Sequence, residues 1–147
     1  MYKLLMWEKN QLTLKNQANF SGIGLHSGIK VEVTLEPANS NSGIVFRRTD
    51  LEKDNEIVAN FKNVSSAKLC TKIQNSSGAS VSTIEHLMAA FYICGIDNII
   101  VNLNGPEVPI MDGSAKDFVK IIKDCGLKVL EGKRKFVKIN NKIELKT

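Results

Sequence analysis

The stretch STIEHLMAAFYICG, residues 82–95, predicts a helix whose two ends are both marked in the sequence. Ser82 is followed three residues later by Glu85, which matches a capping box, a pairing that satisfies free backbone N–H groups where a helix begins. Gly95 is typical of the residue that ends a helix. Between these ends, apolar residues recur at the spacing of one helical face: Ile84, Leu87, Met88 and Phe91.

A second helix of the same kind is predicted between Ser114 and Gly126. Asp117 places a negative charge in the first turn, where the helix dipole favours it, and Gly126 is again a typical end. The apolar residues repeat the spacing of the first helix: Phe118, Ile121, Ile122 and Cys125.

Short segments, several of which alternate apolar and polar residues, predict half-buried strands around the two helices. The turn-prone residues 39–43 predict a hairpin that joins the strands before and after them. Residues 50–63 are polar with weak periodicity, and they predict a loop or an insertion. The predicted strands are Leu12–Leu14, Val31–Leu35, Ile44–Phe46, Leu69–Ile73, Asn98–Leu103 and Phe136–Ile139.

The order of these elements predicts an α+β fold, in which two helices pack on one face of a mainly antiparallel sheet. Residues 1–132 are expected to form this first domain. Residues 133–147 are predicted to be a basic connector followed by a hairpin, with strands Phe136–Ile139 and Lys142–Leu145, which could be the start of a second unit.

The composition favours a folded protein without a membrane-spanning helix. Of the 147 residues, 43% are hydrophobic and 24% charged, which is ordinary for a globular chain. The longest apolar run, Leu87 to Cys94, falls well short of the roughly 18 residues that a membrane helix needs. Three cysteines without close spacing argue against disulfides and against a Cys-x-x-Cys site, so we expect a cytoplasmic protein.

Positive charge is concentrated at the end of the chain. Residues 1–115 hold 10 basic and 11 acidic side chains, whereas residues 116–147 hold 10 basic and 4 acidic ones. Such a cluster could meet phosphates, or it could be a solvated helix face followed by a basic connector. The sequence shows no nucleic-acid recognition motif, and aromatic residues make up only 6%, so a nucleic-acid partner is not expected.

The two histidines, His26 and His86, must carry any catalytic or metal-binding argument. His26 lies in the glycine-rich residues 22–28, which could let a phosphate or sugar approach the backbone, or could form a plain turn. His86 follows Glu85 near the predicted helix start, away from the apolar face. A carboxylate beside an imidazole suits a metal site with a general base. The alternative is that Glu85 only caps the helix and that His86 is a surface residue.

Six motifs, in order along the chain, closely resemble the N-terminal half of the UDP-3-O-acyl-N-acetylglucosamine deacetylases, zinc enzymes of bacterial lipid A synthesis. The resemblance covers residues 11–139, nearly the whole chain. The motifs are GIGLHSG (22–28), FRRTD (46–50), LCT (69–71), VSTIEHL (81–87), GIDN (95–98) and PIMDGSA (109–115).

The resemblance implies a role for each matching residue. His86 matches the zinc ligand of the family's first domain, and Glu85 matches the general base that activates the zinc-bound water. His26 matches a histidine near the diphosphate and sugar of the substrate. Leu69, Cys70 and Thr71 match a strand that lines the active site. Asp112 and Ser114 belong to a motif that turn and cap chemistry already explains, so they are assigned a structural role.

The resemblance also implies what the chain lacks. The family has two similar domains with Zn²⁺ between them, and its other two zinc ligands and its histidine acid belong to the second. Residues 133–147 would then be the basic connector and first hairpin of that missing second domain. We therefore expect a half of this deacetylase that is inactive alone, with UDP-3-O-acyl-N-acetylglucosamine as substrate and a second domain supplied in cis or in trans. The alternative is a non-catalytic UDP-sugar-binding or partner-binding module with the same fold.

Overall fold

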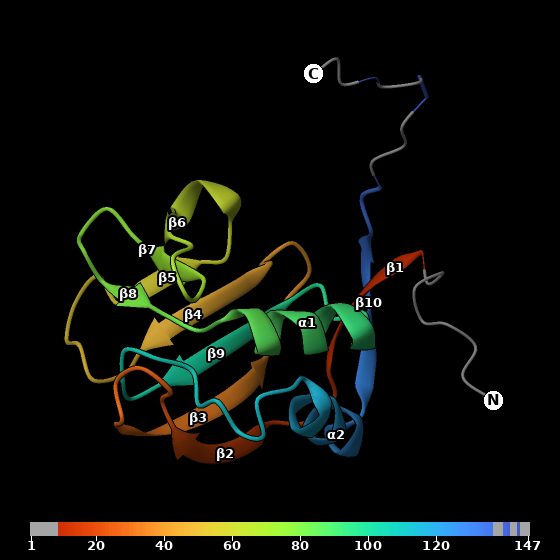
Figure 1. Cartoon of the computed structure of the whole chain (residues 1–147). Helices are drawn as coiled ribbons and strands as arrows, with labels where there is room; N and C mark the ends of the chain where they lie inside the picture. The colour runs from red at the N-terminus through yellow and green to blue at the C-terminus, as the bar shows by residue number, and fades with distance from the viewer. Residues whose placement is uncertain (1–8, 137–139, 142–143, 145–147) are drawn as a thin grey trace.

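A five-stranded sheet forms the centre of the computed structural model, which describes residues 9–136, 140, 141 and 144 (Figure 1). The strand order is β2-β3-β9-β4-β5, and β9 runs antiparallel to β3 and parallel to β4. The predicted hairpin between β3 and β4 is therefore wrong, because β9 lies between them. The strands are β2 (Ala18–Ile23), β3 (Lys30–Pro37), β4 (Ile44–Arg48), β5 (Glu56–Val58) and β9 (Ile99–Leu103).

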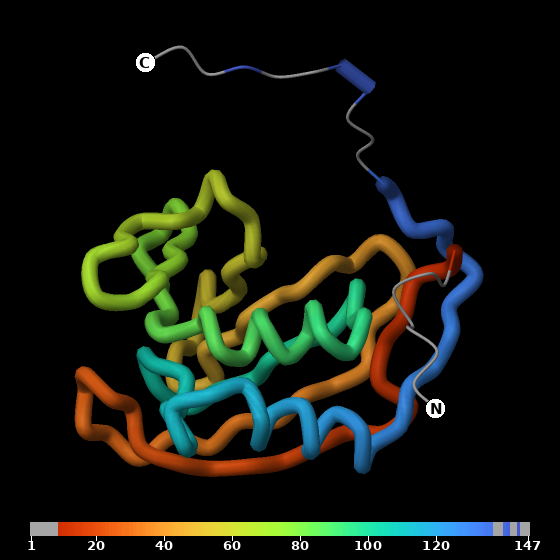
Figure 2. The backbone as a smooth tube through the Cα atoms, turned by 45° about the vertical axis from the view of Figure 1, so that its right-hand side comes forward, coloured from red at the N-terminus to blue at the C-terminus, as the bar shows by residue number. Residues whose placement is uncertain are grey.

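Two helices, α1 (Glu85–Cys94) and α2 (Lys116–Cys125), lie side by side over one face of this sheet (Figure 2). The predicted α+β fold is confirmed. The apolar residues of the predicted helical faces supply much of the contact: Leu87 and Phe91 of α1 and Phe118 of α2 are fully buried. The Phe118 ring meets Phe20 of β2 edge to face, with 5.5 Å between ring centroids.

Two small sheets flank the central one. At one end, β1 (Asn10–Leu14) pairs antiparallel with β10 (Leu127–Lys133). At the other end, a 3-10 helix, η2, leads into a three-stranded sheet (Figure 1). These elements are η2 (Phe61–Asn63), β6 (Val64–Ser66), β7 (Lys72–Gln74) and β8 (Ser80–Val81).

The helix ends agree with the sequence better than the helix starts. Gly95 and Gly126 end the helices with φ of 72° and 73°, as predicted. α2 begins at Lys116 rather than at Ser114, because Ser114 lies in a preceding turn. Its hydroxyl accepts a hydrogen bond from the Lys116 N–H, and it donates one to Asp112 Oδ1, which supports the structural role assigned to this motif.

The strand predictions need correction in three places. Residues 69–71 precede β7 rather than belonging to it, since Leu69 adopts φ of 67°. Residues 50–63 contain β5 and η2 as well as a loop, and β10 was missed.

Arg134, which follows β10, is held by the segment that follows α1. Arg134 donates to the Asp97 carboxylate at 2.6 Å and to the Gly95 carbonyl at 2.7 Å. Asp97 also accepts the Leu12 N–H of β1. The predicted hairpin after Lys135 lies mostly outside the described residues, and the domain boundary at residue 133 stays a prediction.

We predict that Phe118→Ala lowers the free energy of unfolding by about 3–5 kcal/mol, because it leaves a cavity where a fully buried ring joins α2 to the sheet. The matched control is Lys120→Ala on the exposed side of α2, which should change stability by about 0.5 kcal/mol or less. Urea unfolding followed by circular dichroism measures both. Equal effects of the two substitutions would contradict the packing described here.

Candidate functional site

Glu85 and His86 are the first two residues of α1, but the predicted capping box does not form. Ile84 occupies the N-cap position, and no side chain caps the helix. The Ser82 hydroxyl instead donates to the Pro106 carbonyl at 3.0 Å, and the Ser82 carbonyl accepts the Val108 N–H. Ser82 therefore joins the segment before the helix to residues 106–108.

The reason lies in the backbone of Thr83, which adopts φ of 57°. This left-handed conformation is unfavourable for a β-branched residue, and here it turns the chain between Ser82 and Glu85. Thr83 is buried, and its hydroxyl donates to Glu107 Oε1 at 2.7 Å. The turn at Thr83 thus decides where α1 begins and which way its first residues point.

The Glu85 carboxylate is held by the segment before β7. Its Oε2 accepts the Thr71 N–H at 3.0 Å, and the Ile84 N–H donates to the Thr71 carbonyl at 3.4 Å. The structure therefore places Thr71 beside the start of α1. Cys70 is half-buried next to it, whereas the Leu69 side chain is 85% exposed.

His86 is half-exposed, so it does not belong to the enclosed core that lies beneath α1. The predicted placement of His86, near the helix start and away from the apolar face, is confirmed. A metal ligand needs an accessible position of this kind. Within the described part of the chain, no group of three or more His, Cys, Asp or Glu side chains is arranged to hold a metal ion. One imidazole does not meet the usual need of a catalytic zinc site for three protein ligands.

The exposed His26 is held through its backbone by a buried carboxylate, Glu107. Glu107 Oε2 accepts the Ser27 N–H at 2.7 Å, and Oε1 accepts the His26 N–H at 3.0 Å. The loop also closes on itself, because the Gly28 N–H donates to the Gly24 carbonyl. Glu107 and Thr83 thus connect the His26 loop to the start of α1, a link that the sequence analysis missed.

Two opposing effects set the pKa of Glu107. Burial raises it, but hydrogen bonds from the Thr83 hydroxyl, the His26 backbone, and the Ser27 hydroxyl and backbone together lower it to about 2. Glu107 is therefore an anion at neutral pH although its side chain is only 1% exposed.

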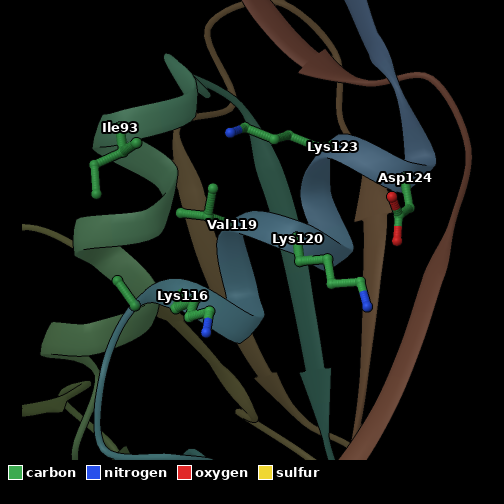
Figure 3. A pocket seen from close by; sticks show the side chains of 7 residues that line it. Ile93, Lys116, Val119, Lys120, Lys123 and Asp124 are labelled. Carbon is green, nitrogen blue, oxygen red and sulfur yellow. The ribbon is translucent and has the colours of Figure 1, made fainter.

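A groove between α1 and α2 lies apart from these residues (Figure 3). Ile93 and Val119 give it an apolar floor, and Ile93 belongs to the end of α1 opposite Glu85. Three lysines and one aspartate border it: Lys116, Lys120, Lys123 and Asp124. Three of the ten basic residues counted in residues 116–147 therefore lie on an exposed side of α2, and the described residues that line the groove include neither imidazole nor thiol.

The comparisons with known proteins concern nearly the whole chain. The family model for LpxC, UDP-3-O-acyl N-acetylglycosamine deacetylase, matches residues 11–147. The chain belongs to this deacetylase family. The motifs that include Glu85, His86 and His26 thus lie within the matched residues.

Relatives named UDP-3-O-acyl-N-acetylglucosamine deacetylase are similar along most of the chain. The one from Geotalea uraniireducens is 52% identical over 136 residues, which are 92% of this chain and 44% of the relative. The one from Pseudoalteromonas atlantica is 47% identical over 136 residues, 92% of this chain and 45% of its own length. The chain therefore spans less than half the length of these deacetylases. In the part of the chain that the structure describes, neither helix is long and apolar enough to cross a membrane.

We predict that Glu107 makes the stability of this deacetylase-family chain depend on acidity. Because folding lowers its pKa from 4.5 to about 2, its contribution is fully present above about pH 5 and is lost as the pH falls through about 2. This shift in pKa corresponds to a contribution of about 3 kcal/mol to the free energy of unfolding above pH 5.

Urea unfolding of the wild type and of Glu107→Gln between pH 7 and pH 2.5 tests this. The difference between them should be largest above pH 5 and shrink towards pH 2.5. Asp50, whose pKa the Arg48 hydrogen bond also lowers, is common to both proteins and cancels in the comparison. A difference that does not change with pH would contradict the prediction.

Proposed function

We propose that this chain supplies the first half of a deacetylase that hydrolyses the acetamide of UDP-3-O-acyl-N-acetylglucosamine and releases acetate. The observation that carries the proposal is the half-exposed pair Glu85 and His86 at the start of α1, in a chain of this family. Both side chains lie off the core, and the Thr71 N–H holds one oxygen of the carboxylate.

In this proposal Glu85 acts as the general base. Its Oε2 is oriented by the Thr71 N–H, which leaves Oε1 to accept a proton from the attacking water molecule. The carboxyl group then holds that proton close to the reacting carbon. The N-terminal end of α1 adds a positive partial charge that favours the negative charge developing on the acetamide oxygen.

His86 is the one zinc ligand that this chain offers in the proposal. Bound zinc would polarise the acetamide carbonyl and make the attacking water more acidic. Because the pair at the start of α1 provides one imidazole and His26 is assigned to the substrate, the remaining ligands and the acid that protonates the leaving amine must come from a second half, in cis or in trans.

The proposed substrate surface surrounds this pair. His26 is assigned to the diphosphate and sugar, since its side chain is exposed while its backbone is fixed. Leu69 and Cys70 are assigned to the lining beside Glu85, because Thr71 connects their segment to the start of α1. The exposed Leu69 side chain offers an apolar surface to the substrate.

We predict that Glu85→Gln reduces the turnover of the assembled enzyme by about 100-fold or more, because an amide cannot accept the proton. The amide oxygen can still accept the Thr71 N–H, so folding should be preserved. Glu56→Gln, at a surface pair with Arg47, is the matched control and should leave turnover unchanged. Near-normal turnover of Glu85→Gln would return Glu85 to a purely structural role.

We also predict that the 147-residue chain alone does not release acetate, because it lacks the further zinc ligands. Mixing it with the separately purified second half of a relative should restore both zinc binding and acetate release. His86→Ala should abolish both in the mixture. Robust deacetylation by this chain alone would overturn the proposal, whereas UDP-sugar binding without restoration would favour the non-catalytic binding module.

A further inference from the structure

A single buried carboxylate, Glu107, connects the two parts of the candidate site. Oε1 accepts the Thr83 hydroxyl at 2.7 Å and the His26 N–H at 3.0 Å, while Oε2 accepts the Ser27 N–H at 2.7 Å. Thr83 leads directly into α1, and His26 belongs to the glycine-rich loop. The same side chain therefore holds two segments that are far apart in the sequence.

We propose that Glu107 is a positioning residue that fixes the His26 loop relative to the start of α1, and so fixes His26 relative to Glu85 and His86. The inference rests on the proposed function for its catalytic consequence. The positioning of the loop relative to α1 is inferred from contacts within this chain and does not depend on the proposed function.

Glu107 is well placed for this task because its own backbone is fixed. Ser82 pairs with the residues on either side of Glu107. The Ser82 N–H donates to the Pro106 carbonyl at 3.0 Å, and the Ser82 carbonyl accepts the Val108 N–H at 3.0 Å. These bonds also immobilise the residue before Thr83. Glu107 is consequently not a side chain that reaches across a flexible gap.

The loop is shaped to close over this carboxylate. A Cβ atom added at Gly24 would lie 2.5 Å from Glu107 Oε2, so glycine is required for the close approach. With Glu107 only 1% exposed, water has little access to replace the N–H donors. Hydrogen bonds to a desolvated anion are stronger than those to a neutral acceptor.

A carboxylate is needed here rather than an amide. Every group that meets Glu107 in these contacts donates: the Thr83 hydroxyl and the N–H groups of His26 and Ser27. Glutamine would direct an NH₂ donor at one of these donors, and a buried donor without an acceptor is costly. Glu107→Gln is therefore a nearly isosteric change that should release the His26 loop, because either orientation of the amide sets its NH₂ group against the His26 or the Ser27 N–H.

The first test measures amide hydrogen exchange of the 147-residue chain by NMR. Glu107→Gln should speed exchange at His26 and Ser27 by about 10-fold or more, while the Thr71 amide, which donates to Glu85, stays protected. Glu56→Gln should change none of them. Thr83→Val removes the hydroxyl that meets Oε1 and should disturb the start of α1 while Ser27 stays protected.

Unchanged exchange at His26 and Ser27 in a folded Glu107→Gln variant would overturn the proposal. If that variant does not fold, a pH titration of the wild type tests the proposal instead. The amide chemical shifts of His26 and Ser27 should then titrate together with a midpoint near pH 2. A midpoint near 4.5, the ordinary pKa from which folding lowers Glu107, would overturn it.

The second test uses the chain assembled with the second half of a relative. Glu107→Gln should reduce kcat/KM, and the reduction should largely disappear in a His26→Ala background, because the loop then holds nothing to position. Equal reductions in both backgrounds would indicate that Glu107 only stabilises the fold. If the wild-type assembly releases no acetate, the proposed function fails, while the exchange experiment still decides what Glu107 holds.

Discussion

The left-handed turn at Thr83 is the constraint on which the candidate site depends. A β-branched residue in this conformation costs about 1–3 kcal/mol, and it persists only where its surroundings hold it. Here a buried hydroxyl bonded to Glu107 and the pairing of Ser82 with residues 106–108 provide that hold. Without the turn, α1 could begin at Ser82 with an ordinary capping box, and Glu85 would point at its own helix rather than at Thr71.

The sequence predicts well those elements whose pattern is local. Both helices and their glycine ends follow from apolar spacing and turn chemistry within about fourteen residues. Strand pairing is different, because β9 enters between β3 and β4 although 50 residues, 49–98, separate it from the end of β4. No local signal distinguishes this arrangement from a hairpin. The alternating burial of β9 shows that one face of the strand is buried, but it does not show which strands pair with it.

The same distinction separates the predicted from the missed parts of the site. Glu85 and His86 are adjacent, so their combination is visible in the sequence, and the family resemblance adds a role to each. Glu107 binds backbone N–H groups about eighty residues away, and backbone donors carry no sequence signature. The signal that was available is a glutamate beside the apolar segment Val108–Ile110, since a charge at a buried position must be paired.

A site divided between two halves places a particular demand on each of them. If the remaining zinc ligands come from a second half, that half cannot also hold Glu85, His86 and His26 in register before the two meet. Misplacing a catalytic group by about 1 Å can cost about 100-fold in rate, so each half must arrange its own residues in advance. The contacts from Thr71 to Glu85 and from Glu107 to Thr83 and His26 all lie within this chain. In a divided site of the proposed kind, these contacts would position the residues of this half before the second half binds.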